Sequence, residues 1–179
     1  MATTATTPLL SGTYNADPVH SSFGFGVRYQ GVSLFKGTLG DVEATLSDGR
    51  LEGKATVESI SITTPDQFRQ HVLSAEFFDA ENHPEVTFTS SDLDLREDGT
   101  ATVRGELTIK GITRPVEATG TWTAPEPDAF GNTRGHLKLE AVIDRTDWDM
   151  NWNMDLPSGG KVLSNEVILT VELSLIEQA

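Results

Sequence analysis

The sequence predicts an all-β domain, built as a sandwich or a barrel of antiparallel strands with one short helical segment inserted. Two observations carry this prediction. Apolar and polar residues alternate along most of the chain, and turn residues recur between the alternating stretches. Alternation with period two is typical of strands with one buried face. Many such strands at regular spacing favour a sandwich or a barrel over a helical architecture.

The first clear strand has an apolar face of Phe23, Phe25 and Val27, with Gly24 and Gly26 on the opposite face. Glycine weakens the interior of a strand because it has no side chain to pack. Its repetition here indicates close approach of another backbone, strong coiling of a barrel, or space left for a ligand.

Further stretches show the strand pattern at 51–63, 85–96, 101–110, 116–123, 136–144 and 166–176. The first of them changes phase near Ser59, which predicts a bulge. Turn signals separate these stretches at 47–49, 97–99, 110–111 and 129–135. Turns between consecutive strands favour antiparallel neighbours.

One segment has helical spacing instead. Thr64 is placed to cap a helix, Pro65 suits its first position, and Gln67 can complete a capping box. Phe68 and Val72 then fall on one face. We expect this segment to lie across a barrel mouth as a lid.

The length of the chain fits one domain, because two domains in 179 residues would each have a thin core. We expect a flexible tail over residues 1–11 and a single barrel domain over residues 12–179. The first ten residues lack the basic and apolar regions of a signal peptide. A cytoplasmic location is therefore expected, or a periplasmic or secreted one if a leader was removed.

Composition limits the partners and the chemistry. A formal net charge of −14 and the lack of a Lys/Arg cluster argue against nucleic acid. The chain contains no cysteine, which excludes disulfides, thiol catalysis and thiolate metal sites. No stretch approaches the roughly 20 apolar residues of a membrane span, so we expect no stable membrane insertion. The oligomeric state is left open, with a homodimer among the alternatives.

Several motifs in chain order resemble the YceI-like family. They lie at 14–25 (YNADPVHSSFGF), 68–79 (FRQHVLSAEFFD), 83–88 (HPEVTF), 105–113 (GELTIKGIT), 144–148 (DRTDW) and 166–167 (EV). Together they cover nearly the whole chain. The resemblance implies an extended lipocalin-like barrel of eight antiparallel strands that binds polyisoprenoids or similar amphiphiles. The predicted function is therefore the binding, storage or transport of a polyisoprenoid or another long-chain amphiphilic lipid in the barrel interior.

Large apolar side chains are the candidates for an apolar tunnel. A barrel of about eight strands can hold one elongated ligand, or it can be filled by its own side chains. Ordinary core packing is therefore the alternative role for each candidate. The candidate tunnel residues are Phe23, Phe25, Val27, Leu39, Phe77, Phe78, Phe88 and Trp122.

The polar head group of an amphiphile needs its own partners. His20 and Ser21 precede the first clear strand, and Arg69 and His71 lie on the helical segment. An arginine suits a phosphate or hydroxyl head group because its donors form a fork. The alternative is structural: His20 and Ser21 brace the lid by hydrogen bonds, and Arg69 pairs with a surface carboxylate.

The sequence contains no recognisable catalytic or metal motif. The four histidines form neither His-x-His nor His-Glu-x-x-His, and Gly-x-Ser-x-Gly does not occur. The carboxylates around Arg145, between Asp144 and Asp155, are expected to form surface ion pairs and turn caps. The stretch 159–161 is expected to be a hairpin turn.

We therefore predict no metal, no cofactor apart from a bound lipid, and no enzymatic activity. Two alternatives stay open. One is an enzyme that acts on an isoprenoid or lipid substrate, with His20 or His71 as the acid or base. The other is a ligand-free stress-response module.

Overall fold

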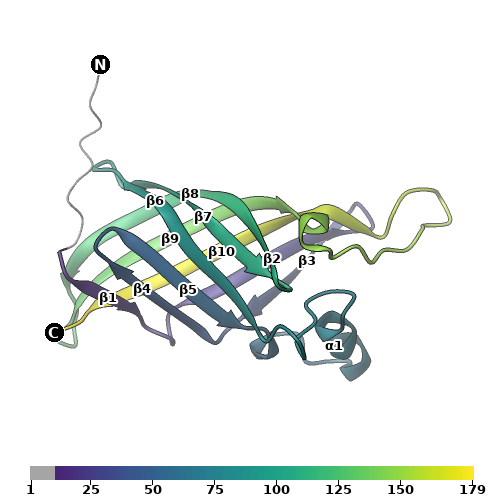
Figure 1. The fold of residues 1–179 in the computed structure, drawn as a ribbon, viewed down its shortest axis with the longest axis horizontal. Helices are drawn as coiled ribbons and strands as arrows, with labels where there is room; N and C mark the ends of the chain where they lie inside the picture. Colours follow the sequence, from purple (N-terminus) through teal and green to yellow (C-terminus); the bar gives the residue numbers. More distant parts are fainter. Residues whose placement is uncertain (1–10) are drawn as a thin grey trace, which may run out of the picture.

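Antiparallel strands form one sheet that closes on itself in the computed structural model, which describes residues 11–179 (Figure 1). The predicted tail therefore lies outside the described residues, apart from Ser11. The strands are β1 (Thr13–Ala16), β2 (Ser22–Tyr29), β3 (Ser33–Leu39), β4 (Val42–Ser47), β5 (Arg50–Thr56), β6 (Glu85–Leu95), β7 (Thr100–Ile109), β8 (Ile112–Pro127), β9 (Thr133–Asp144) and β10 (Leu163–Glu177).

The ring closes through β10. Strand order runs β1-β4-β5-β6-β7-β8-β9-β10, and β1 pairs back to β10. On the side away from β9, β10 pairs first with β2 and then, near its end, with β1. The hairpin of β2 and β3 thus extends the barrel beyond β1 and β4 at one end. An eight-stranded antiparallel barrel of the lipocalin-like kind is confirmed, and the sandwich alternative is wrong.

Several predicted element boundaries differ from the structure. The stretch 51–63 is not one strand with a bulge: β5 ends at Thr56, and the 3-10 helix η1 (Val57–Ser59) follows. The predicted stretches also missed β1, β3 and β4. Each of these is seven residues or shorter, so the alternation within it is brief.

The predicted helix forms as α1 (Asp66–Leu73), but the predicted capping box is wrong. Pro65 occupies the N-cap position, and no side chain caps the helix. The carbonyl of Pro65 instead accepts from the backbone N–H groups of Phe68 and Arg69. With the helix beginning one residue later than expected, Thr64 lies too far upstream to cap it.

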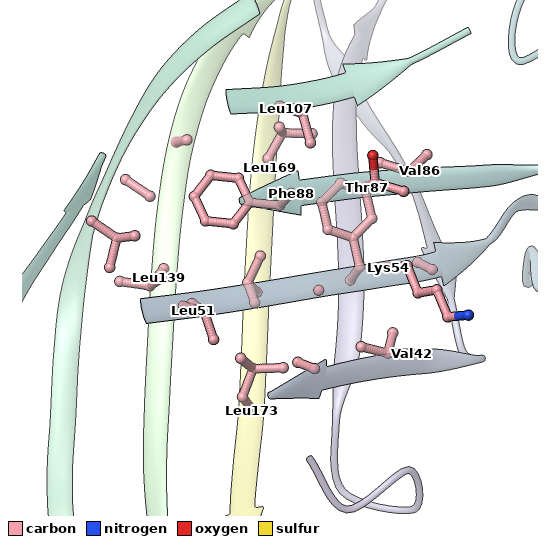
Figure 2. Close-up of a pocket in the computed structure, with 18 of the residues that line it drawn as sticks. Val42, Leu51, Lys54, Val86, Thr87, Phe88, Leu107, Leu139, Leu169 and Leu173 are labelled. Atoms are coloured by element: carbon pink, nitrogen blue, oxygen red, sulfur yellow. The ribbon is translucent and has the colours of Figure 1, made fainter. Parts of the chain in front are cut away.

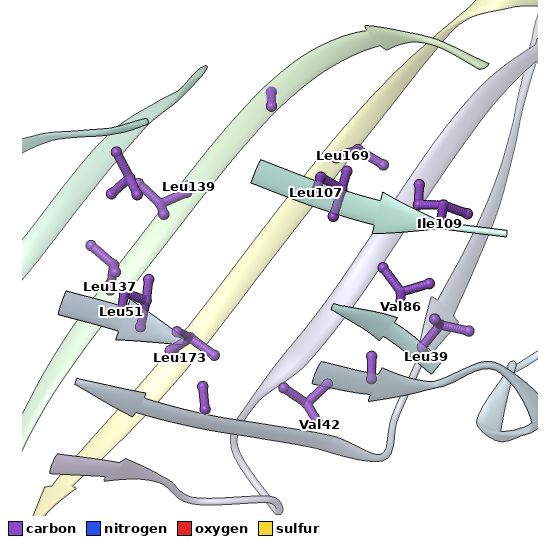
Figure 3. Packing of buried hydrophobic residues seen from close by; sticks show 14 of the residues in the cluster. Leu39, Val42, Leu51, Val86, Leu107, Ile109, Leu137, Leu139, Leu169 and Leu173 are labelled. Atoms are coloured by element: carbon purple, nitrogen blue, oxygen red, sulfur yellow. The ribbon is translucent and has the colours of Figure 1, made fainter. Parts of the chain in front are cut away.

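Side chains from strands around the ring fill the middle of the barrel (Figure 3). Leu51, Leu107, Leu139 and Leu173 point inward from four different strands and are nearly fully buried. Each comes from the buried positions of an alternating pattern, as the period of two requires. Most of the open space of the barrel therefore lies at the end near α1, and a smaller void remains between these side chains.

Candidate ligand-binding cavity

A cavity of about 860 Å³ occupies the end of the barrel near α1. Its walls come from β2, β3, α1, β10 and the long connection that follows the 3-10 helix η2 (Arg145–Trp148). Figure 1 shows this connection reaching out from the same end of the barrel as α1. The lining side chains are mostly aromatic and aliphatic. These elements are far apart in sequence, so only the closed fold brings them together.

One aromatic cluster joins α1 and the turn after it to the β2–β3 hairpin. The ring centroid of Phe25 lies 6.4 Å from that of Phe35 and 5.9 Å from that of Phe78. Phe35 meets Phe68 edge-on at 5.5 Å. Tilted and edge-on pairs at these distances are the favoured arrangements of aromatic rings. The cluster holds α1 beside the cavity, in the position expected of a lid.

A second cluster joins the C-terminal end of α1 to the connection after η2. The His71 ring lies edge-on to Phe77 at 5.0 Å and to Trp152 at 4.7 Å. His71 Nε2 lies 2.5 Å from Glu76 Oε2. All three rings line the cavity. This is the place where a histidine, a carboxylate and the cavity meet, so the enzyme alternative would have to rest on His71.

A smaller void of about 100 Å³ lies deeper in the barrel (Figure 2). Its walls include Leu51, Val86, Phe88 and Leu139, and the ammonium group of Lys54 points away from it. Both spaces are bordered by Phe23 and Leu169. Phe23 and Leu169 therefore stand between the two spaces.

The structure places most of the predicted tunnel residues on these walls. Phe23, Phe25, Val27, Phe77 and Phe78 line the larger cavity. Phe88 lines the smaller void instead. Their contact with a ligand remains a prediction.

The other two predicted tunnel residues lie away from both spaces. Leu39 is fully buried in the packed core and lines neither of them. Trp122 lies beside Tyr14 and Leu95 around a void of about 10 Å³. Its Nε1 donates to the carbonyl of Arg96 at 2.7 Å. The indole therefore has a structural partner away from the cavity.

Only one of the four predicted head-group residues, His71, lines the cavity. His20 Nδ1 lies 2.8 Å from Asp17 Oδ2, and the His20 side chain is largely exposed. Ser21 Oγ accepts from the backbone N–H of Ser174, which ties the β1–β2 break to β10. Arg69 Nη2 donates to the carbonyl of Glu58 at 2.9 Å rather than to a carboxylate.

Sequence reasoning missed Arg145, which lines the cavity and is 3% exposed. Its Nε donates to the carbonyl of Ser164 at 2.9 Å, and its Nη1 donates to the carbonyls of Met150 and Trp152. Nη2 is buried and has no hydrogen-bond partner among the described residues. Burial lowers the pKa of Arg145, because a charged group loses its hydration there.

The expected surface ion pairs do form, but their cations are Lys110 and Lys161 rather than Arg145. Within residues 11–179, no carboxylate lies within ion-pair distance of its guanidinium group, because Arg145 turns inward. Asp144 caps η2 by accepting from the backbone N–H of Thr146, and Asp155 pairs with Lys161. The expected turn cap and the expected hairpin turn at 159–161 are confirmed.

Neither a metal cluster nor a membrane-spanning helix is found in the described part of the chain. No three His, Asp or Glu side chains between residues 11 and 179 converge as metal ligands would. No helix in that range is both long and apolar enough to cross a bilayer.

The chain thus forms a closed eight-stranded antiparallel barrel with an apolar cavity at one end, an architecture whose interior is either filled by side chains or open to one small ligand. The model of the YceI-like domain matches residues 14–175. The chain therefore belongs to the YceI-like family, as the motifs predicted.

Relatives in sequence and in structure agree with this assignment. A UPF0312 protein of Pectobacterium atrosepticum is 27% identical over 166 residues, which cover 89% of this chain and 83% of that protein. A UPF0312 protein of Ectopseudomonas mendocina is 25% identical, with 86% of this chain and 81% of the relative covered.

Two solved structures share the fold. Burkholderia cenocepacia BcnA has a TM-score of 0.69 at 16% identity, over 91% of this chain and 99% of that one. A polyisoprenoid-binding domain from Saccharophagus degradans, implicated in plant cell wall breakdown, has a TM-score of 0.68 at 14% identity. That match covers 92% of this chain and 98% of the domain. At these identities the likeness concerns the fold alone.

Proposed function

We propose that this protein binds a polyisoprenoid or another long-chain amphiphile in the cavity near α1, for storage or transport. The observation that carries the proposal is the cavity itself, about 860 Å³ in volume and walled mainly by apolar side chains. Small-molecule sites in proteins typically have volumes of about 300–1,000 Å³ and largely apolar walls. The polyisoprenoid-binding neighbour from Saccharophagus degradans supports the same ligand class.

The energetics favour a long apolar tail. Each buried carbon contributes about 0.8 kcal/mol, so ten buried carbons contribute about 8 kcal/mol before ordering costs are subtracted. The rings of Phe25, Phe35, Phe78 and Trp152 offer broad contact surfaces to such a tail. The smaller void beyond Phe23 gives it room to extend.

We assign His71 and Glu76 to holding the end of α1 rather than to acid–base catalysis. The imidazole is packed edge-on against Phe77 and Trp152, and its Nε2 is hydrogen-bonded to the carboxylate of Glu76. Each of these contacts joins the end of α1 to the segments beside it. The pair thus has a structural role that fits a wall of the cavity.

The test is to identify what the purified chain carries. Lipid extraction followed by mass spectrometry should find a co-purifying amphiphile, and the emptied protein should bind added geranylgeraniol. Val27→Trp places a large ring in the cavity, so this variant should carry no co-purifying amphiphile and should not bind geranylgeraniol. Val142→Trp makes the same change on β9 at a position that is 58% exposed, and it should leave both intact. If the emptied wild-type protein binds no long-chain alcohol, the proposal is wrong.

A further inference from the structure

We propose that Arg145 binds the acidic head group of an anionic amphiphile, a carboxylate or a phosphate, at the wall of the cavity. This inference rests on the proposed function and gives the ligand a charge. It also replaces the head-group assignment made from the sequence, which favoured His20, Ser21, Arg69 and His71.

The guanidinium group of Arg145 is held in place on one side and free on the other. Three backbone carbonyls, those of Ser164, Met150 and Trp152, accept from Nε and Nη1. These bonds use every N–H of those two nitrogens. The two hydrogens on Nη2 are left without an acceptor among residues 11–179. An arginine fixed in this way is already oriented to donate to a ligand.

The charge of Arg145 is also left without a partner. A buried cation is normally paired with an anion, because burial without a counter-charge is costly. The carboxylate next to it in sequence, Asp144, is occupied by the backbone and side chain of Thr146 at 2.9 and 2.6 Å. The lowered pKa of Arg145 has desolvation as its main cause, and only the more distant charge of Asp144 opposes it.

The other titratable groups on the cavity wall do not supply that counter-charge. Asp155 lines the cavity but is paired with Lys161 and largely exposed, and Glu76, which lies beside the wall, is held against His71. Tyr29 also lines the cavity, and its hydroxyl accepts a hydrogen bond from Gln30 Nε2 at 3.2 Å. A ligand that brings its own anionic oxygen would therefore complete both the hydrogen bonds and the charge balance of this wall.

The position of Arg145 sets the direction of the ligand. The carbonyls of Met150 and Trp152 belong to the connection between η2 and β10, which forms the outer wall of the cavity. An acidic head group at Arg145 leaves the tail to run towards Phe23 and the smaller void. Because Nη2 is itself buried, part of the wall beside it must move aside to admit the head group.

The experiment compares ligands that share one tail. Hexadecanol, hexadecanoate and hexadecyl phosphate are titrated into delipidated full-length protein at about pH 8, where both acids are ionised. We expect at least one of the two acids to bind about tenfold more tightly than the alcohol, as a charge-assisted hydrogen bond predicts. The stronger of the two identifies the head group as a carboxylate or a phosphate.

Two substitutions locate the effect. Arg145→Gln removes the charge and should bring the acid-to-alcohol ratio to about one, while the affinity for hexadecanol stays within about threefold. Arg69→Gln removes a nearby cation that does not line the cavity, and it should keep the wild-type ratio. The wild-type comparison stands by itself if Arg145→Gln does not fold.

The outcomes separate the two proposals. Equal affinity of the wild-type protein for acid and alcohol would overturn the role of Arg145 and leave the proposed function in place. Failure of all three ligands to bind would overturn the proposed function. Inorganic phosphate serves as a probe without a tail. If it binds Arg145 as tightly as hexadecyl phosphate does, the site holds a free anion and the inference is wrong.

Discussion

The ring of Phe25 on β2 lies directly over Gly37, its cross-strand partner on β3. A Cβ atom added to Gly37 would lie 2.5 Å from Cζ of Phe25, closer than two non-bonded carbon atoms can approach. The Phe25 ring therefore occupies the space that a side chain at position 37 would need. Through this contact the ring reaches Phe35 and Phe78 and forms part of the cavity wall.

Gly37→Ala should therefore displace the Phe25 ring. We expect a loss of about 1–3 kcal/mol in the free energy of unfolding, because an overpacked site forces side chains from their preferred rotamers. Urea denaturation measures this loss. Gly24→Ala is the matched control on the same hairpin, since an added Cβ there meets nothing closer than 3.6 Å. Equal losses in the two variants would contradict the account.

Trp122 lies at the end of the barrel away from the cavity, so a substitution there tests whether ligand binding depends on that end. Trp122 donates its indole N–H to the carbonyl of Arg96, and its neighbours there are Tyr14 and Leu95. Trp122→Phe should cost about 1 kcal/mol of stability, since it leaves that carbonyl without this donor. The affinity for geranylgeraniol should not change. A loss of affinity at retained stability would show that Trp122 contributes to binding after all.

Arg134 joins a carboxylate at the β1–β2 break, Asp17, to one in the β8–β9 turn, Asp128. It lies 2.9 Å from Asp17 and 3.1 Å from Asp128. Hydrogen bonds from His20 and then Arg134 hold the pKa of Asp17 well below its usual range. The backbone N–H of Asn132, followed by that of Phe130, lowers the pKa of Asp128.

Acid should therefore destabilise the fold through these groups. The unfolded carboxyl has the higher pKa, about 3.9, so the unfolded chain binds protons first as the pH falls. The stabilisation is complete above that value and is lost as the pH falls through it towards the folded pKa. Urea denaturation between about pH 6 and pH 2 should show this loss. Asp17→Asn should be less stable than the wild type at neutral pH, and its free energy of unfolding should fall less steeply with acid. Asp48→Asn should follow the wild type.

The contact between Phe68 and Phe35 should control the mobility of α1. Phe68 is 40% exposed, so its main packing partner in the aromatic cluster is the Phe35 ring at 5.5 Å. Phe68→Ala should speed amide hydrogen exchange in residues 66–78 and hasten release of a bound alcohol, with the barrel strands unchanged. Val32→Ala, at an exposed turn position, is the control. Unchanged exchange in α1 would contradict this role.

Alternation in the sequence predicted which face of a strand turns inward but not how far along the barrel a residue lies. Phe25 and Trp122 both looked like tunnel residues, yet they lie at opposite ends. A period of two carries no information on height within the barrel, which depends on strand register and tilt. The motifs nevertheless predicted the family and the eight-stranded barrel correctly.

Arg145 could not be found from the sequence for a related reason. Its neighbours Asp144 and Asp147 indicated an exposed, ion-paired stretch. The inward direction of its side chain depends on carbonyls at Met150, Trp152 and Ser164, which converge only after η2 and β10 have formed. Local sequence cannot show such a convergence, because backbone carbonyls are common to every residue.

The double pairing of β10 has a consequence for biosynthesis. Closure joins Tyr14 to Glu177, nearly the two ends of the described chain. While the ribosome is still translating, β1 and β2 have no β10 to pair with, and the edge of β9 stays uncovered. Contacts of such long sequence separation form slowly, and unpaired edges invite aggregation. The pairing edges of β2 and β9 therefore stay open until β10 has been made.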